Sequence, residues 1–180
     1  MAGRGSASLA KWRRQALRDI PASRRETAAF IARLPEDEIL RPRTIDRWSV
    51  KDVLGHLMAC DEETVQRFRL IARGHADRIH WFESMADADR FNARTVARSR
   101  RLGLAALLRR KKRVGAQFLA WFRRLPIESL RDPAHQYPVT EWLPAPGWSH
   151  ERDHVGEVRA WWRARRKELA RAGSRRPLSP

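Results

Sequence analysis

Apolar residues along this chain recur three and four positions apart, the spacing that places side chains on one face of an α-helix. The clearest case starts at Ser49, a helix-capping residue, and stops at Gly74, a residue typical of helix ends. Its apolar positions are Val50, Val53, Leu54, Leu57, Val65, Phe68 and Ile71. We find no segment that alternates apolar and polar residues as a strand would. The pattern predicts an all-α protein.

Further helices are predicted on both sides of this one. Residues 9–20 form a short helix that Pro21 stops, and Ser23 with Glu26 gives the start signal of a helix that lasts to Pro35. A third region runs from 87 to 125 with a break at Gly103. Ser149 caps the last helix, whose inner side carries Val155, Val158, Trp161, Trp162 and Leu169.

The connections are predicted from turn-forming residues and from missing periodicity. Residues 35–47 and 75–89 lack a helical period, and four prolines between 133 and 147 exclude a long helix there. We therefore predict one domain over residues 9–172, with flexible tails at 1–8 and 173–180. Its expected architecture is an up-down four-helix bundle with a long crossing loop before the last helix.

Composition changes this picture little. The 180 residues carry a net charge of +17, which makes nucleic acid the first partner to consider, yet the basic residues are spread along the chain. The densest runs, 109–113 and 163–167, are typical of solvated helix faces, so nucleic-acid binding is not favoured. No apolar run approaches the ~20 residues of a membrane span, and the N-terminus lacks a signal-peptide stretch. A single cysteine excludes an internal disulfide framework and a multi-cysteine zinc ribbon. We expect a cytoplasmic protein.

His150 and His154 are four residues apart on the last predicted helix, so both imidazoles could reach one metal ion. With Glu151 they also match the H-E-x-x-H signature of zinc peptidases. The extended form of that motif needs Gly and His where this chain has Glu157 and Ala160, and no sheet is predicted. We interpret the peptidase match as a chance agreement.

His56 lies on the second predicted helix beside the apolar stripe. A lone histidine there is usually a residue at the edge of the core, but Gly55 next to it costs about 1 kcal/mol relative to alanine. The glycine indicates a close approach, either by a ligand or by another helix. Cys60, one turn later, could be a soft metal ligand, although a small buried apolar side chain is the more common case.

Three segments together resemble one family: Trp48-Ser-x-x-Asp-Val-Leu-Gly-His56, Phe91-Asn92, and His150-x-x-x-His154. They are similar to the DinB-like superfamily over residues 10–171. That superfamily includes thiol S-transferases that use bacillithiol or mycothiol, mycothiol-dependent maleylpyruvate isomerases, and ClbS/DfsB resistance proteins. The resemblance implies a four-helix bundle with a metal site at His56, His150 and His154.

The same resemblance implies a divalent metal, Zn or Ni, and a low-molecular-weight thiol such as mycothiol or bacillithiol. The implied activity is a metal-dependent transferase that acts on a small-molecule substrate, and such bundles often form homodimers. A non-catalytic small-molecule-binding or resistance protein with a vestigial metal site is the alternative, and a basic nucleic-acid-binding protein comes third.

Other candidate residues have two interpretations each. Trp48 and Trp161 are candidate pocket walls, with plain core packing the favoured alternative. Glu151 and Asp153 could orient ligands or favour the helix N-terminus electrostatically, and we prefer the second for Asp153. The loop histidines, His75, His80 and His135, are expected to be exposed. No catalytic residue is assigned.

Overall fold

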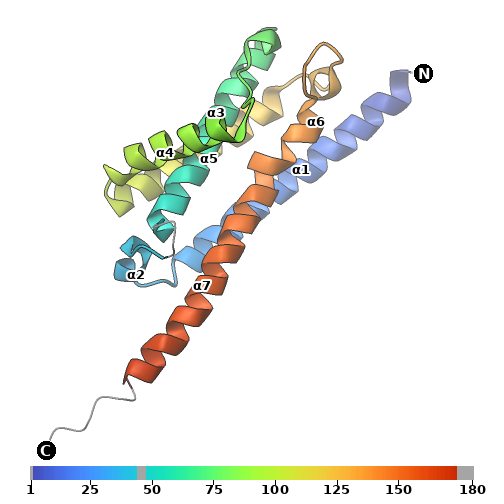
Figure 1. The fold of residues 1–180 in the computed structure, drawn as a ribbon. Coiled ribbons are helices and arrows are strands. Elements are labelled where there is room, and N and C mark those ends of the chain that lie inside the picture. The colour runs from blue at the N-terminus through green and yellow to red at the C-terminus, as the bar shows by residue number, and fades with distance from the viewer. Residues whose placement is uncertain (1, 44–47, 174–180) are drawn as a thin grey trace, which may run out of the picture.

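The computed structural model of the chain describes residues 2–43 and 48–173 (Figure 1). These residues are mostly helical and contain no strand, which confirms the all-α prediction. The long helices are α1 (Ala2–Ile31), α3 (Val50–Ala72), α4 (Met85–Arg100), α5 (Leu104–Arg124) and α7 (His150–Gly173). Short pieces join them: α2 (Glu36–Leu40), η1 (Ala76–Arg78), η2 (Glu128–Arg131), α6 (Val139–Trp142) and η3 (Ala145–Ser149).

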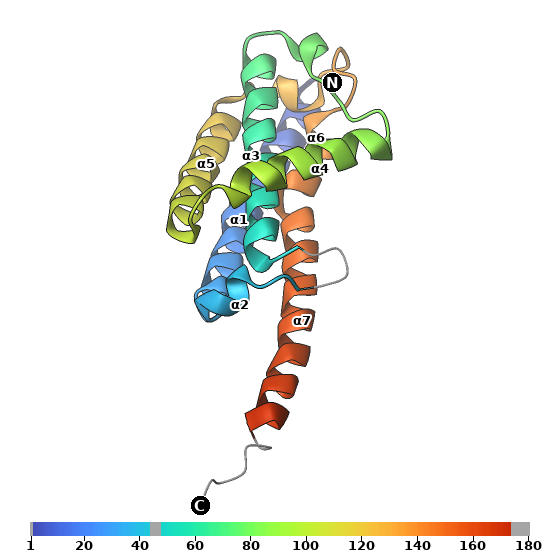
Figure 2. The ribbon, with the colours of Figure 1, turned by 60° about the vertical axis from the view of Figure 1, so that its left-hand side comes forward.

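Four of the long helices run along a common axis, and α4 lies obliquely across them. In Figures 1 and 2, α1 and α7 run in one direction and α3 and α5 in the other. The break predicted at Gly103 is present, and it separates two helices: α4 ends at Arg100, and Gly103 is the residue before α5. The simple up-down order is therefore corrected: α3 and α5 are parallel.

Both ends of α3 form as the sequence predicts. Ser49 Oγ accepts a hydrogen bond from the Asp52 N–H, and the Asp52 carboxylate accepts one from the Ser49 N–H, each at 3.0 Å. This capping box satisfies two backbone donors at the start of the helix. At the other end Gly74 has φ of +72°, a left-handed conformation that favours glycine. These caps fix where His56 lies along α3.

α1 departs from the prediction, because it passes through Pro21 without a break. A proline inside a helix costs about 3 kcal/mol. Packing offsets that cost, since Ala16 and Ile20 before the proline and Ser23 after it are all buried. Ser23 is therefore an interior residue of one long helix and does not start a second. α1 also begins at Ala2, within the flexible tail predicted for residues 1–8.

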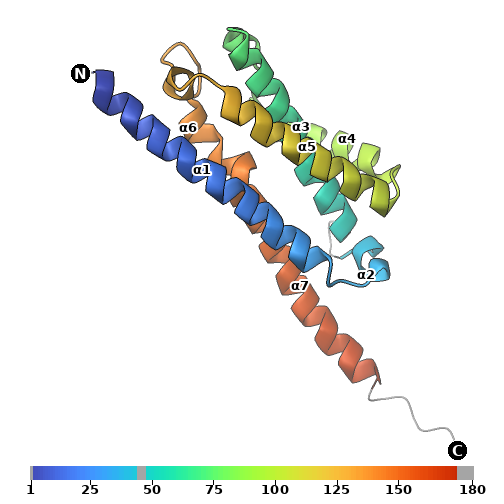
Figure 3. The ribbon, with the colours of Figure 1, turned by 180° about the vertical axis from the view of Figure 1, so that it is seen from behind.

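The proline-rich segment before α7 contains short helical turns where we predicted a long crossing loop. Its last turn, η3, is a π-helical turn that continues directly into α7. Ser149 therefore does not cap α7; its hydroxyl donates to the Pro144 carbonyl at 3.0 Å. α7 extends to Gly173, and of the C-terminal tail predicted for 173–180, residues 174–180 lie outside the described residues. The second half of α7 projects past the other helices (Figure 3).

The core contains two apolar clusters. The first surrounds Phe68, Phe118 and Phe122, and the second surrounds Leu54, Leu107 and Val158. Inside the bundle, four helices (α1, α3, α5 and α7) also contribute one charged residue each to a set of linked ion pairs: Arg24, Asp61, Lys111 and Glu151. We call these four residues the charge layer. None of the helices described is long and apolar enough to cross a membrane.

Candidate metal centre

The three histidines predicted as ligands converge between α3 and α7. His150 Nε2 lies 3.2 Å from His56 Nε2 and 2.9 Å from His154 Nε2. One nitrogen from each ring lies within 4.8 Å of the other two. Donors around one tetrahedral zinc at 2.0–2.1 Å are about 3.3 Å apart, so the two closest spacings are near those of a shared ion. The three side chains could hold a metal ion.

Their surroundings keep at least two of these imidazoles neutral, the form that binds a metal. Burial, and then the neighbouring charges of His150 and His154, lower the pKa of His56 to about 3. Burial also lowers the pKa of His150, and a positive charge on His154 acts in the same direction. Burial and the neighbouring rings therefore disfavour protons on His56 and His150 and leave their ring nitrogens available.

Neighbouring side chains orient two of the rings. His154 Nδ1 lies 3.5 Å from Glu157 Oε2, so a proton on Nδ1 leaves Nε2 free to face His150. A carboxylate behind a metal-binding histidine commonly has this effect. The Trp48 ring lies 5.3 Å from the His56 ring and 6.5 Å from the His154 ring, between centroids. Trp48 therefore walls the cluster on one side.

Cys60 lies one turn after His56, with Sγ 3.7 Å from His56 Nε2. Burial and the nearby Asp61 carboxylate raise the pKa of the Cys60 thiol to about 12, with Arg67 acting in the opposite direction. The side chain is therefore a thiol at neutral pH. Without a bound metal it is therefore neither a thiolate ligand nor a nucleophile, whereas a metal ion bound to it would lower this pKa.

Two open cavities border the histidines. The larger, about 530 Å³, reaches His150 and is walled by aromatic rings and by one face of α3. The smaller, about 440 Å³, is bordered by Trp48, Asn92 and His154. Trp161 borders neither cavity and packs against the second apolar cluster. Core packing is therefore the role that the structure gives Trp161.

Glu151 belongs to the charge layer and is only 4% exposed. Its carboxylate lies 3.1 Å from Lys111 Nζ and 3.9 Å from Arg24 Nε, while Arg24 also pairs with Asp61 at 2.7 Å. These cations hold the carboxylate inside the bundle, so it is not a base at the histidine cluster. The rejection of the peptidase interpretation agrees with this position.

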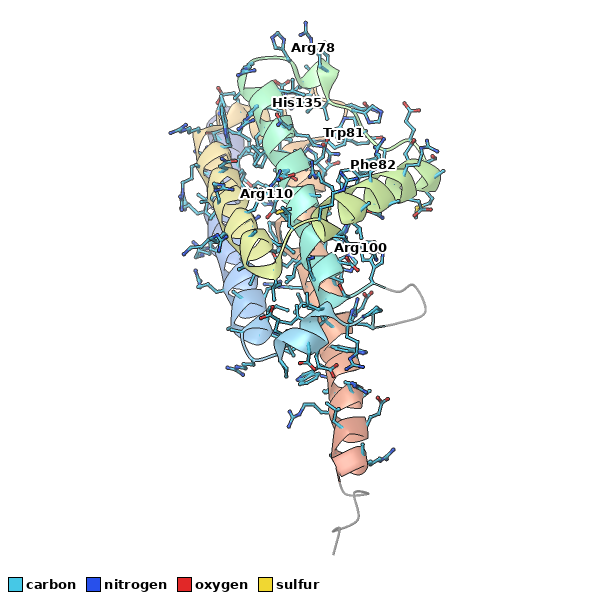
Figure 4. The ribbon with its side chains drawn as sticks, turned by 90° about the vertical axis from the view of Figure 1, so that its left-hand side faces the viewer. Arg78, Trp81, Phe82, Arg100, Arg110 and His135 are labelled. Atoms are coloured by element: carbon cyan, nitrogen blue, oxygen red, sulfur yellow. The ribbon has the colours of Figure 1, made fainter. Side chains whose placement is uncertain are left out.

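Three sequence expectations about polar residues need adjustment. Lys111, in the run expected to be a solvated face, is largely buried in the charge layer. His135, expected to be exposed, is largely buried, with Nε2 3.8 Å from Asp132. It lies on the connection between η2 and α6 (Figure 4). His80 is exposed as expected, and His75 is partly buried.

Sequence reasoning missed the polar face of α3 that borders the larger cavity. His56, Cys60, Glu63 and Arg67 are four, three and four residues apart, so they share one side of the helix. Cys60, Glu63 and Arg67 all line the larger cavity. The spacing was visible in the sequence, but the aromatic rings opposite come from distant segments that carry no period.

The fold and the histidine cluster define an all-α bundle protein with a candidate three-histidine metal centre. The chain belongs to the DinB superfamily, whose family profile matches residues 20–158. That match covers His56, His150 and His154 and ends four residues after the last of them. Comparison with curated proteins and with solved structures gives no match.

Proposed function

We propose that this protein is a metal-dependent transferase that joins a low-molecular-weight thiol to an electrophilic small molecule. The observation that carries the proposal is the convergence of three ring nitrogens beside an open cavity. Membership of the DinB superfamily supports a metal site at this place. A divalent ion bound there would lower the pKa of a coordinated thiol and favour its thiolate at neutral pH.

The chain's own residues support an external thiol. Without a bound metal the Cys60 side chain is a thiol at neutral pH, and the Glu151 carboxylate is paired with two cations inside the bundle, so neither is a ready nucleophile or base at the cluster. His56, His150 and His154 each place a ring nitrogen in the cluster, and Glu157 lies beside the third ring. In the reaction, the thiol gives up its proton to water, its sulfur bonds to the acceptor's electrophilic carbon, and the bond from that carbon to the leaving group breaks, so that the leaving group departs with the electron pair.

The proposal is tested first by metal content. Purified protein exposed to Zn²⁺ or Ni²⁺ and then dialysed should retain one equivalent, measured by elemental analysis. His154→Ala should lose most of it, whereas His80→Ala, the same change at an exposed histidine outside the cluster, should retain it. Full metal content in the His154→Ala protein would contradict the site. Wild-type protein that takes up neither metal would favour a non-catalytic bundle.

The second test is activity. Metal-loaded protein should join mycothiol, bacillithiol or glutathione to an electrophilic aryl halide, measured by halide release. Chelator treatment should abolish the reaction, and added metal should restore it. A wild-type protein that binds the metal stoichiometrically but transfers none of these thiols would overturn the assignment as a thiol transferase.

A further inference from the structure

The larger cavity contains a buried charge whose pairing is incomplete. Arg67 on α3 is 9% exposed, and its Nε lies 3.5 Å from Glu63 Oε1. Among the described residues no other carboxylate lies within ion-pair distance of Arg67, and its Nε donates no hydrogen bond. Burying a cation is costly unless charged or polar groups compensate. One partly exposed carboxylate at this distance compensates it weakly.

Three aromatic rings lie around the guanidinium, and Glu63 is the one carboxylate of the described residues that is paired with it. Its central carbon lies 4.4 Å from the Trp81 ring centroid, 5.7 Å from that of Trp142 and 5.9 Å from that of Phe82. Figure 4 shows Trp81 and Phe82 on the connection that precedes α4. The rings stabilise the cation through their π faces but accept no ordinary hydrogen bond. Trp142 adds a buried indole N–H that also has no partner in the residues described.

The cavity is therefore lined by two residues, Arg67 and Trp142, that each carry a donor without an acceptor, within an aromatic wall. Arg67 Nε and Trp142 Nε1 are the two unpartnered donors, and Tyr137 and Phe91 extend the apolar lining. An anionic group would complete the pairing of Arg67, because a guanidinium can bind a carboxylate or sulfonate through two parallel hydrogen bonds. Glu63 and Asp153 also line the cavity, and their negative charges oppose an anionic group anywhere except against Arg67.

We propose that this cavity binds a small molecule with a flat apolar body and one anionic group, which pairs with Arg67. His150 lines the same cavity, and Arg67 lies eleven residues after His56, about 16 Å along α3. The Arg67 side chain leans back towards the start of α3, as helical side chains do. A ligand anchored at Arg67 would extend towards the histidine cluster. Its role as the acceptor substrate rests on the proposed function, whereas its binding at Arg67 does not.

Two fluorescent probes with the same ring skeleton test the proposal. The anionic probe 8-anilinonaphthalene-1-sulfonate should bind wild-type protein more tightly than neutral N-phenyl-1-naphthylamine. Arg67→Gln should weaken binding of the anionic probe about 10- to 100-fold, the loss expected for a hydrogen bond to a charged group. The neutral probe should change less than about threefold. Arg69→Gln, an arginine two residues away outside the cavity, should alter neither.

Trp142→Phe provides a second variant in case Arg67→Gln does not fold, as judged by far-UV circular dichroism. This substitution removes the unpartnered N–H and keeps an aromatic ring. It should therefore weaken the binding of the anionic probe and leave the binding of the neutral probe unchanged. The proposal is overturned if a folded Arg67→Gln protein binds the anionic probe as wild type does, or loses both probes equally. It is also overturned if Trp142→Phe leaves the preference for the anion unchanged when Arg67→Gln is unfolded.

The two proposals fail separately. His154→Ala should lose the metal and keep the preference for the anionic probe. If wild-type protein binds no metal but still prefers the anionic probe, and Arg67→Gln removes that preference, the transferase proposal fails and the cavity proposal remains supported. If the protein binds metal but the probes show no dependence on Arg67, the cavity proposal alone fails.

Discussion

Replacing Gly55 by alanine tests the contact between α3 and α4. A Cβ atom added at Gly55 would lie 2.2 Å from Ser99 Oγ and 2.5 Å from Ser99 Cβ. Rotating the Ser99 side chain would move its hydroxyl away, at the loss of its hydrogen bond to the Val96 carbonyl at 2.9 Å. Rotation cannot move Ser99 Cβ, which the backbone fixes. The helices must therefore separate by roughly 1 Å to restore an ordinary carbon–carbon contact.

The expected change in the free energy of unfolding is the sum of two destabilising contributions and one stabilising contribution. Overpacking costs about 1–3 kcal/mol, and the lost hydrogen bond costs about 1 kcal/mol. The better helix propensity of alanine returns about 1 kcal/mol. We expect Gly55→Ala to destabilise the protein by about 1–3 kcal/mol. Gly156→Ala is the matched control on α7, where the added Cβ meets nothing within 4 Å; it should stabilise the protein by about 1 kcal/mol.

Urea unfolding at pH 7, followed by far-UV circular dichroism, measures both changes. The double variant Gly55→Ala with Ser99→Gly removes the clashing side chain. The double variant should be more stable than the sum of the two single changes in unfolding free energy predicts. The difference should be about 1–2 kcal/mol, the coupling expected of residues in contact. If Gly55→Ala stabilises the protein as much as Gly156→Ala does, then α3 and α4 do not approach as closely as this reasoning requires.

Two further predictions concern buried carboxylates whose ionisation is coupled to folding. Burial alone would raise the pKa of Asp52, but hydrogen bonds from Arg100 and Ser49 lower it below its ordinary 3.8. The ionised carboxylate therefore stabilises the fold above about pH 4, and this stabilisation is lost as the pH falls. Asp52→Asn should lower the free energy of unfolding by about 1–3 kcal/mol at pH 7, and its urea midpoint should approach that of the wild type as the pH falls. A difference between the two midpoints that stays constant down to pH 3 would contradict this. Burial raises the pKa of Asp61 to about 6, so folding takes up protons there and stability decreases as pH rises from about 4 to 6. The unfolding free energy of the wild-type protein should decrease over this pH range, and that of Asp61→Asn should not. Equal slopes of unfolding free energy against pH in the two proteins would refute the raised pKa of Asp61.

Much of α3 could be predicted because its determinants are local. The Ser49 and Asp52 cap, the apolar spacing and the left-handed Gly74 are all close in sequence. Gly55 was recognised as a sign of close approach, but the sequence left open whether a ligand or a helix approached. Ser99 resolves that choice, because it comes from α4, whose path across α3 depends on the whole bundle.

The errors arose where distant packing outweighs a local preference. Pro21 is a strong local stop, yet buried neighbours on both sides keep α1 continuous. Ser149 has the sequence context of a cap, yet a π-helical turn occupies the position where an ordinary cap would stand. π-Helical turns often occur at functional sites, and this one immediately precedes His150. The residue pattern does not indicate such a turn, because it arises from how the preceding segment packs.

The contacts of Glu151 show what the H-E-x-x-H spacing specifies in this chain. Glu151 follows His150 directly, so the sequence alone cannot separate a metal-site base from a structural carboxylate. The bundle separates them: His56 from α3 meets His150 and His154, while Lys111 from α5 and Arg24 from α1 hold Glu151 inside the charge layer. These two ion pairs commit the Glu151 carboxylate to the interior of the bundle and not to the histidine cluster. The spacing therefore identifies two candidate ligands, and the residue between them anchors the helix that carries both.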